Sequence, residues 1–588
     1  MVVTATPVPP TEPPPTAAPQ AADTVVLVLQ QEPDTLHPDI GSMMARTIAL
    51  GPVFVGCMRQ NEKAEWIAMG CEDIPTLENG GAAFVGEGAD KQMEITYKIK
   101  DGWRWTDGTP VTAKDAVYWW WLNMQPDFEV ADRSGFEQYG SVEAVDDKTI
   151  VVKYMSENQV NAAIAGTLAP VETEFGNVDF AAYQADYSEL YGDWTGKGPL
   201  TNPVYWNSVA WRPSHILSSI PAADQAASDF AKKPVGDGPF VVKEWKQGQE
   251  IVLEKSDQPF PLGDAKIKTI IFRIIGETAA VIAALQNGEV DAVTGTGGLT
   301  VNNAPDLDKI EAAGLYKVLY QPGYQWEHID LNTKKFPMDD LKVRQALYYA
   351  IDKQALVEKL YYGKQSTTDL PVPPGLSWAY TDTYVKYPFD QEKAKALLAE
   401  AGWDCSALPC TKEIDGKPTK LEFTLMTTDR ADRQALAQVI QQMWKAINVG
   451  VNLQFLYGRG LFATKEAGGP LNSGTFQAAI YTFVTGDDPQ FLALYSCTGG
   501  QNYPQWCNEE ADAQIQINEV NPDTSLSREA RKPALEKFFQ IWTGEVPVIP
   551  LFSNTRVYVV RTGFVNWKAG PTSAAPDTWN TWEWELTK

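Results

Sequence analysis

Residues 328–363 read HIDLNTKKFPMDDLKVRQALYYAIDKQALVEKLYYG, and this stretch decides the fold. Its first residues predict a short apolar strand, which a polar loop follows. Beyond the loop, apolar residues recur at intervals of three and four, the period of a helix with one buried face. That stripe consists of Val343, Ala346, Leu347, Ala350, Ile351, Val357 and Leu360. Asp339 or Asp340 can cap the start and Gly363 can end it, so we predict one long amphipathic helix.

Four other segments predict an alternation of strands and helices. Residues 24–38, TVVLVLQQEPDTLHP, begin with a buried strand and continue as a loop that holds His37 as a loop residue rather than a ligand. Residues 94–121 read as a strand, a turn at Asp107-Gly108 and a helix that Thr112 and Asp115 cap together. Residues 235–257 are rich in glycine but lack the Gly-Lys-Ser/Thr of a phosphate loop, so we expect tight turns there. Residues 270–293 predict a strand, a helix and a second strand.

These segments, in this order, resemble the peptide-type substrate-binding proteins of ABC importers, known as solute-binding family 5. The pattern in 328–363 is similar to that family's N-T, D-D, V-R-x-A and A-I-D sequence, and the resemblance extends over residues 24–588. It implies an α/β fold of two lobes, the type II periplasmic-binding-protein-like fold, with an extra domain on lobe I and a ligand cleft between the lobes. The implied divisions are a tether at 1–23, lobe I at 24–60, 195–275 and 545–588, an extra domain at 61–194, and lobe II at 276–544.

The resemblance also implies where a ligand binds. In peptide binders of the family, an Asp four residues before the Pro of an Asp-Pro pair holds the peptide's α-ammonium. The pair here is Asp488-Pro489, and the matching position is Thr485, which cannot neutralise a cation. Asp487 can substitute if the loop shifts. The resemblance to peptide-type members of the family makes an oligopeptide the expected solute. A short oligosaccharide is the alternative, because sugars suit aromatic walls and neutral hydrogen-bonding groups.

Eight residues follow as candidates for ligand contact, with core packing as the alternative for each of them. Two follow the first strand, one precedes the strand that begins 328–363, four lie in or after the strand around residue 480, and one lies in the returning segment VPVIPLFSN. They are Met43, Met44, Trp326, Tyr481, Phe483, Thr485, Asp487 and Phe552.

Composition narrows the classes of function. The 588 residues carry a net charge of −26, which repels phosphate backbones, so we expect no nucleic-acid partner. No window approaches 18 consecutive apolar residues, so we predict no membrane span. None of the hydrolase or nucleotide-binding motifs H-E-x-x-H, G-x-S-x-G, S-x-x-K or Walker A occurs, and we expect no catalytic residues, no cofactor and no enzyme activity. A secreted hydrolase is the alternative from a different class.

The six cysteines bear on the compartment. They allow 15 pairings, among which the sequence does not select, but neighbour pairing is the simplest. It would join Cys57 with Cys71, Cys405 with Cys410, and Cys497 with Cys507. With three His in the chain and no C-x-x-C spacing, we expect no metal site. Disulfides would indicate an oxidising, extracytoplasmic location, whereas free buried thiols would not.

The first 22 residues hold seven Pro and no aromatic side chain, which predicts a disordered tether. Such spacers follow the lipid-bearing Cys of many bacterial surface lipoproteins, and we expect that a signal peptide and that Cys belong before residue 1. A cytoplasmic linker is the alternative. The expected partners are the solute, the permease subunits of an importer and, through the lipid anchor, the membrane. We expect a monomer.

Overall fold

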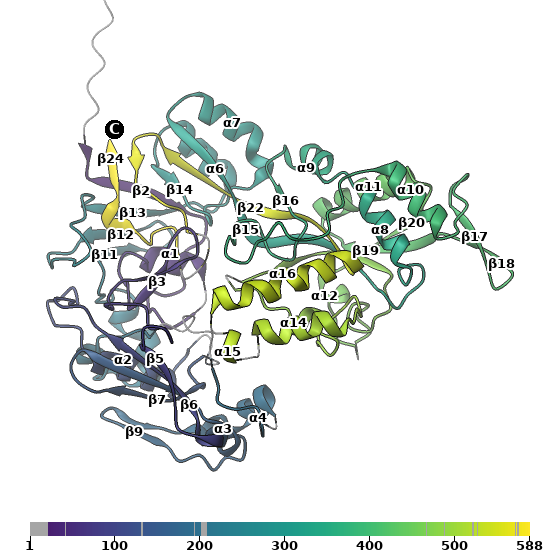
Figure 1. Ribbon diagram of the computed structural model, residues 1–588. Coiled ribbons are helices and arrows are strands. Elements are labelled where there is room, and N and C mark those ends of the chain that lie inside the picture. The colour runs from purple at the N-terminus through teal and green to yellow at the C-terminus, as the bar shows by residue number, and fades with distance from the viewer. Residues whose placement is uncertain are drawn as a thin grey trace, which may run out of the picture.

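Two long strands, β15 (Tyr316–Leu331) and β22 (Val548–Arg561), run side by side through the middle of the molecule and join its two lobes (Figure 1). The structure is a computed structural model that describes residues 21–41, 43–130, 133, 135–192, 194–201, 209–465, 467–486, 488–519, 522–525, 527–570, 572 and 575–587. Most of the predicted tether and Asp487 therefore lie outside the described residues. No described helix is long and apolar enough to cross a membrane.

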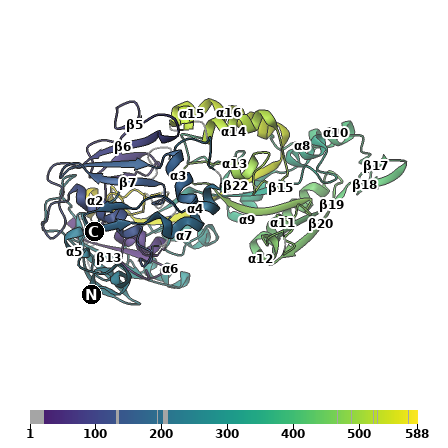
Figure 2. The same ribbon diagram turned by 90° about the horizontal axis from the view of Figure 1, so that it is seen from below.

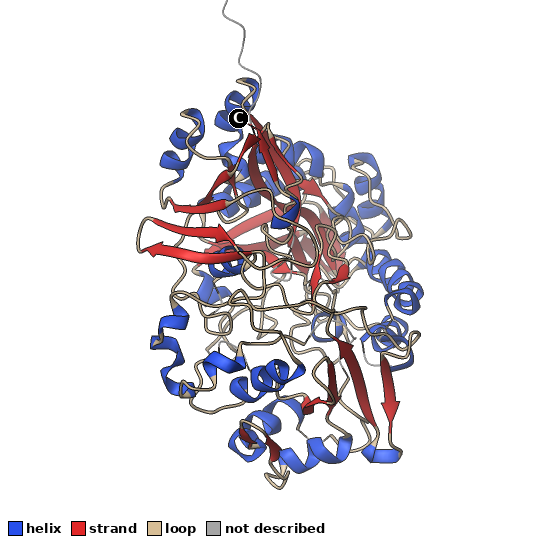
Figure 3. Ribbon diagram, turned by 90° about the vertical axis from the view of Figure 1, so that its left-hand side faces the viewer, coloured by secondary structure: helices blue, strands red, loops and turns tan. Residues whose placement is uncertain are grey.

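One mixed sheet of 11 strands extends across both lobes in the order β11-β12-β13-β2-β14-β22-β15-β21-β19-β20, with β16 beside β22. In Figure 3 the strands of the upper half gather near its middle, and helices lie on both sides of them. The predicted α/β class is thereby confirmed. The other strands of the sheet are β2 (Thr24–Leu29), β11 (Phe240–Lys246), β12 (Glu250–Lys255), β13 (Thr269–Ile274), β14 (Ala292–Val293), β16 (Ser366–Thr367), β19 (Glu422–Thr428), β20 (Gly450–Leu456) and β21 (Ala478–Val484).

Strand β2 shows why its sequence is a continuous apolar run. Val25, Leu27 and Leu29 point into one core, which α1 (Met44–Leu50) covers. Val28 points into a second core on the opposite face, with α6 (Thr278–Gln286) and α7 (Ala304–Ala312). A strand that neighbours cover on both faces has no side that requires polar residues.

The same cores bear on the boundary between the lobes. Helices α6 and α7, β14 and the first part of β15 share a core with β2, whereas the C-terminal part of β15 packs in the cores of lobe II. The pairing of β15 with β22 is irregular between Pro322 and Trp326. We therefore propose that the lobes divide near residue 322 on β15 and near residue 554 on β22, rather than at residues 276 and 545. At the N-terminal end, Ala21 and Ala22, expected in the tether, form β1 and pair with β24 (Glu585–Thr587), which also pairs with β23 (Phe564–Val565).

The extra domain lies beneath lobe I in Figure 1 and is built on a four-stranded sheet of order β5-β6-β8-β7. Seen from below, β5, β6 and β7 lie on one side of the molecule, and the hairpin of β17 (Thr411–Ile414) and β18 (Lys417–Lys420) lies at the far end of lobe II (Figure 2). The elements of this region are β3 (Met58–Gln60), β4 (Trp66–Ala68), β5 (Ala82–Val85), β6 (Gln92–Lys98), α2 (Ala113–Asn123), β7 (Tyr139–Ala144), β8 (Thr149–Tyr154), α3 (Glu157–Ile164), β9 (Val171–Thr173), β10 (Gly176–Val178) and α4 (Gln184–Tyr191).

The prediction of one long helix after the strand at residue 328 is wrong. Two helices form instead, α8 (Leu341–Tyr349) and α9 (Lys353–Tyr361). The chain leaves the first helix at Ala350, and the Asp352 carboxylate accepts the Ala355 N–H at 2.9 Å, so it caps the second. At the start of α8 the predicted cap is confirmed, because the Asp340 side chain accepts the Lys342 N–H. Periodicity missed the break because both helices bury their apolar faces in the same core.

The remaining helices of lobe II pack on the two faces of the sheet. Helix α11 contacts β19 and β20, and α14 packs against α16 over a separate aromatic core. These elements, with the projecting hairpin, are α10 (Gln391–Glu400), β17 (Thr411–Ile414), β18 (Lys417–Lys420), α11 (Ala431–Lys445), α12 (Gly458–Leu461), α13 (Leu492–Tyr495), α14 (Glu509–Glu519), α15 (Pro522–Ser525) and α16 (Arg528–Glu545).

Two buried carboxylates tie lobe I to the extra domain. Asp115 accepts hydrogen bonds from the Thr112 N–H at 2.9 Å, which confirms the predicted capping pair, and from the Trp105 indole at 3.1 Å. The backbone N–H and the hydroxyl of Ser214 also donate to it. Asp237 accepts from the N–H groups of residues 55 and 56 and from two indoles. Residues 94–121 and 235–257, which resemble family sequences, therefore form a structural junction.

Glycines in residues 235–257 serve close packing, as expected. A Cβ on Gly236 would lie 2.0 Å from the Val53 carbonyl oxygen, and one on Gly238 would lie 2.3 Å from that of Pro52. His37 lies in the loop after β2 and is fully buried, where its Nε2 contacts the Gln225 side-chain oxygen at 3.1 Å. Burial lowers the pKa of His37 from 6.5 to about 4, so the imidazole is neutral at physiological pH.

All three neighbour disulfides are present and confirm the simplest pairing. They join Cys57 to Cys71, Cys405 to Cys410, and Cys497 to Cys507. Each closes a short loop within one region of the chain, so none of them restrains one lobe against the other.

Candidate functional site

The β3–β4 hairpin is a point of contact between the first half of the chain and lobe II. Its turn residue Ala64 is fully buried and packs in the aromatic core of lobe II that contains Tyr324 and Trp326. The carbonyl oxygen of Ala64 lies 3.4 Å from a guanidinium nitrogen of Arg528, the first residue of α16. Asn61 shapes the turn, because its side-chain oxygen accepts two backbone N–H groups within it. Residues distant in sequence therefore meet where the lobes approach each other.

Beside this contact, strands β15 and β21 form an aromatic ladder. Trp326 lies opposite Phe483 and His328 opposite Tyr481 in the strand register. The His328 ring is 4.4 Å from the Trp326 ring and 4.3 Å from the Tyr481 ring, measured between centroids. These side chains are aligned because successive side chains of a strand point to alternate faces of the sheet, so cross-strand partners share one face.

The ladder ends on a buried carboxylate. The Tyr481 hydroxyl donates a hydrogen bond to Asp330, and His328 Nε2 lies 3.4 Å from the other Asp330 oxygen. Burial and the negative charge of Asp330 raise the pKa of Tyr481 well above its usual value, so the phenol stays protonated. Trp326 and Tyr481 are 1% and 3% exposed, which makes them the floor of any binding surface rather than its open wall.

Phe483 and Thr485 line a cavity of about 380 Å³ at the end of β21. The Thr485 hydroxyl donates to the Pro371 carbonyl at 3.0 Å, and its N–H donates to the Tyr324 carbonyl at 2.8 Å. The cavity also includes Asp488, which forms a buried ion pair with Arg531 of α16. Both hydrogen-bonding groups of Thr485 and the carboxylate of Asp488 are thus engaged within the protein.

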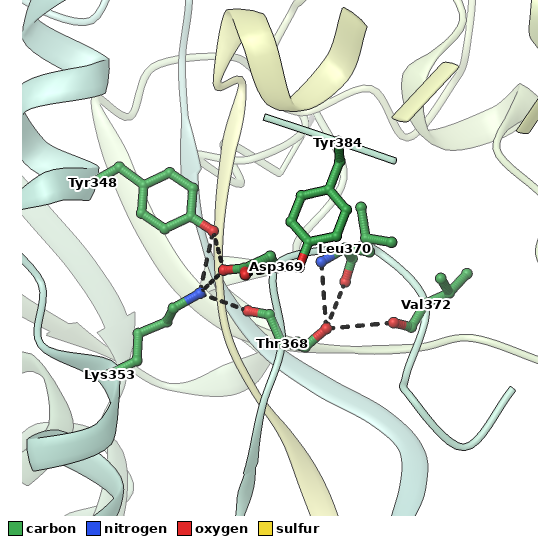
Figure 4. Close-up of polar contacts among 7 residues, drawn as sticks. All are labelled: Tyr348, Lys353, Thr368, Asp369, Leu370, Val372 and Tyr384. Atoms are coloured by element: carbon green, nitrogen blue, oxygen red, sulfur yellow. Dashed lines mark hydrogen bonds and ion pairs between the residues drawn. The ribbon is translucent and has the colours of Figure 1, made fainter. Parts of the chain in front are cut away.

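The loop that receives Thr485 is itself anchored by a polar cluster (Figure 4). Lys353 donates to the Thr368 carbonyl at 2.8 Å and pairs with Asp369. The hydroxyls of Tyr348 and Tyr384 donate to the two oxygens of Asp369 at 2.9 and 3.1 Å. Burial raises the pKa of the Asp369 carboxyl, but the Lys353 ammonium and the hydroxyl donors outweigh it and lower that pKa overall. The cluster anchors the loop from which Pro371 lines the cavity.

The other candidates lie elsewhere. Met43 and Met44 stand at the start of α1, half-buried, and Met44 packs on the core of lobe I. Phe552 is 2% exposed and packs in the core of lobe II, with its ring 4.8 Å from that of Tyr361. The structure thus brings Trp326, Tyr481 and Phe483 together with Thr485. It places Met44 and Phe552 at separate cores and Met43 at the start of α1. Contact between a ligand and any of the eight stays a prediction, and Asp487 lies outside the described residues.

Sequence reasoning missed three features of this region. The buried pairs of Asp488 with Arg531 and of Glu327 with Arg433 join residues 43 and 106 positions apart in the chain. The hairpin tip at Ala64 reads in sequence as an ordinary polar turn. No local pattern marks any of them, because each depends on which elements pack together. Among the described residues, no cluster of His, Cys, Asp or Glu has the arrangement of a metal site.

The sequence profile of the bacterial extracellular solute-binding proteins, family 5 (middle region), matches residues 86–503 of this chain. That span covers more than half of the protein. The chain belongs to this family. The sequence is 29% identical over 434 residues to the oligopeptide-binding protein AppA of Bacillus subtilis, which covers 72% of this chain and 69% of that protein. It is also 26% identical to the oligopeptide-binding protein OppA of the same organism, over 91% of this chain and 88% of OppA.

Solved structures show the same fold. The structure of the family member AppA from Bacillus subtilis in complex with a nonapeptide covers 97% of this chain and 100% of its own, with a TM-score of 0.56 and 24% identity. The predicted two-lobe periplasmic-binding-protein-like fold is thereby confirmed. In the present chain, the ladder of β15 and β21 and the cavity beside it lie on the side of lobe II that the β3–β4 hairpin contacts.

Proposed function

We propose that this protein is the extracytoplasmic substrate-binding component of an ABC importer and that it binds an oligopeptide in the cleft between its lobes. Membership in the solute-binding family is the observation that carries the proposal, together with relatives named as oligopeptide-binding proteins. Three disulfides support an oxidising location outside the cytoplasm. Delivery to a permease, attachment through a lipid anchor and a monomeric state complete the proposal, and the protein acts by binding rather than catalysis.

The joint between the lobes is suited to a hinge. Strands β15 and β22 run through the middle of the sheet, and their pairing is irregular from Pro322 to Trp326. Gly323 packs so closely that a Cβ would lie 2.8 Å from the Asn554 carbonyl oxygen. A ligand that contacts both lobes stabilises the closed arrangement by the difference between its affinities for the two states.

The direct test is to identify what the protein carries. Purified protein is denatured, and the released ligand is identified by mass spectrometry; the emptied protein is then titrated by calorimetry with tripeptide to nonapeptide panels and with cello- and xylo-oligosaccharides. We expect peptides to be released and to bind. Release and binding of oligosaccharides, with no peptide bound, would overturn the peptide proposal.

A single substitution tests the ammonium site. If Asp487 meets the α-ammonium of the peptide, Asp487→Asn should weaken peptide binding by about 2–5 kcal/mol, the range for breaking a desolvated charged pair. Asp264→Asn is the control, because that carboxylate is 88% exposed on lobe I. Unchanged peptide affinity in Asp487→Asn would remove Asp487 from the site.

A further inference from the structure

A second cavity, of about 360 Å³, lies at the junction of lobe I and the extra domain. Helix α1, the β3–β4 hairpin and α2 contribute to its lining. Its volume is within the range of small-molecule sites in proteins. Trp66 of the hairpin lines it, two residues beyond Ala64, which is buried against lobe II. Because an extended chain spans at most about 3.6 Å per residue, the backbone of this lining residue lies within about 7 Å of Ala64.

The lining combines aromatic rings with guanidinium groups. Trp119 and Phe136 pack edge to face, with ring centroids 5.0 Å apart. Arg46, Arg59 and Arg212 also line the cavity. Arg212 is engaged, since it pairs with both oxygens of Asp39. The other two arginines form no ion pair with any residue that the structure describes.

Arg59 is the critical residue. Among the described residues, its guanidinium donates to two backbone carbonyls and to no other group: those of Gly51 at 3.0 Å and of Phe54. Burial lowers its pKa to about 10, and only the charge of Asp237 opposes this effect. The Asp237 carboxylate already accepts four N–H groups. A buried cation without a paired anion is costly, and an anion entering the cavity would offset that cost.

Trp119 supplies a second donor. It is 6% exposed and lines the cavity, and its indole N–H makes no hydrogen bond to a described residue. Its neighbours on α2 differ: the Trp120 indole donates to the Phe136 carbonyl at 3.3 Å, and Trp121 does not line the cavity. The lining thus offers N–H donors on Arg59 and Trp119, with ring faces around them.

We propose that this cavity binds a carboxylate carried on an apolar or aromatic body. Arg59 and Trp119 hold the carboxylate, and the rings of Trp66 and Phe136 surround the body. If the protein binds peptides as proposed above, the source is the C-terminal residue of a peptide lying in the cleft. A free aromatic acid carries the same chemistry, and the experiment separates the two sources.

The test is calorimetry on the full chain with matched acid and amide probes. N-acetyl-L-phenylalanine and its carboxamide represent the free acid, and Ala-Ala-Ala-Phe and its C-terminal amide represent the peptide. We expect each acid to bind at least about tenfold more tightly than its amide, because the amide offers no negative charge. Trp119→Phe and Arg59→Gln should each weaken acid binding and leave amide binding unchanged. Trp121→Phe, a half-buried Trp two positions along the same helix, should have no effect.

Folding must be separated from binding, because Arg59 also holds two backbone carbonyls. Arg59→Lys keeps the charge and should retain part of the affinity, while Trp119→Phe leaves the hydrogen bonds between the described residues of the junction intact. A circular dichroism melt accompanies each variant. If Arg59→Gln does not fold, Trp119→Phe alone decides, and its failure to weaken acid binding would overturn the inference.

The outcomes distinguish a failure of the cavity site from a failure of the peptide proposal. Tetrapeptide acid and amide that bind equally, with both variants silent, would overturn the cavity site while supporting peptide binding. N-acetyl-L-phenylalanine that binds in a Trp119-dependent manner, with no tetrapeptide binding, would support the cavity site and count against the peptide source. Binding of neither probe would overturn the cavity site.

Discussion

Two buried carboxylates at the junction of lobe I and the extra domain are held differently from three carboxylates of lobe II. At the junction, Asp115 and Asp237 accept hydrogen bonds from backbone amides, indoles and a serine, all neutral donors. In lobe II, Glu327, Asp369 and Asp488 face Arg433, Lys353 and Arg531. The first arrangement distributes the negative charge over several dipoles, and the second cancels it with one cation.

The difference has a consequence for each region. Removing one neutral donor leaves a carboxylate with most of its partners, whereas removing a cation leaves a buried charge without its counterion. At the junction, neutral donors occupy Asp237, and Arg59 therefore has no carboxylate partner there. The junction therefore has a cation available to an outside anion. In lobe II, Arg433, Lys353 and Arg531 are paired with carboxylates, while Arg344 of α8, like Arg59, donates to backbone carbonyls.

The largest effect is expected from Arg531→Leu. The side chains of Arg531 and Asp488 are 2% and 3% exposed, so the substitution leaves a buried carboxylate without its cation. The free energy of unfolding should fall by about 3–5 kcal/mol. Urea denaturation followed by tryptophan fluorescence measures it. Lys532→Ala removes the adjacent exposed pair with Glu529 and should cost under about 0.5 kcal/mol. Equal effects of the two substitutions would contradict the comparison.

The pH dependence at His37 should come next. Its pKa is about 4 in the folded protein against 6.5 ordinarily, so the unfolded chain takes up the proton first as the pH falls. The stability that neutral His37 contributes is therefore complete above about pH 6.5 and declines toward pH 4, by about 3 kcal/mol in all. Denaturation at pH 7, 5.5 and 4.5 should show a shallower decline for His37→Gln than for the natural protein. An unchanged slope would rule out His37 as a source of acid sensitivity, and His215→Gln is the control.

Asp237→Asn tests the neutral-donor side of the comparison. Oδ1 accepts one N–H and Oδ2 accepts three, so in either orientation the new NH₂ group confronts at least one N–H donor, and we expect a loss of about 1–3 kcal/mol in unfolding free energy. Asp264→Asn at an exposed position should change it by under about 1 kcal/mol. A loss from Asp237→Asn as large as that from Arg531→Leu would mean that neutral donors and cations hold buried carboxylates alike.

The smallest effect is expected from Thr485→Val. The substitution removes the hydrogen bond to the Pro371 carbonyl, which is worth about 0.5–1.5 kcal/mol of stability. Because the hydroxyl is already engaged, peptide affinity measured by calorimetry should change by less than about twofold. A large loss of peptide affinity without a loss of stability would instead place Thr485 in contact with the ligand.

Much of the fold could be predicted from local sequence. The apolar run of β2, the cap formed by Thr112 and Asp115, and the close glycines at 236 and 238 appear where the residues predict them. The division of residues 341–361 into two helices was missed, because Asp352 serves equally well inside a charged helical face or as a cap. Of the candidate site, the sequence predicted the strand that holds Tyr481 and Phe483 but neither the hairpin contact at Ala64 nor the cavity at Arg59.

By itself the sequence determined the family, the α/β class and the local elements, because caps, turns and apolar periods act over a few neighbouring residues. The disulfides belong with these, since each pair is close in the chain. Only the tertiary structure decided which charges meet. Arg531 reaches Asp488 across 43 residues, while Arg59 is buried at the junction without a carboxylate partner. Burial and partnership of a charge depend on the packing of distant elements, and no local pattern encodes that packing.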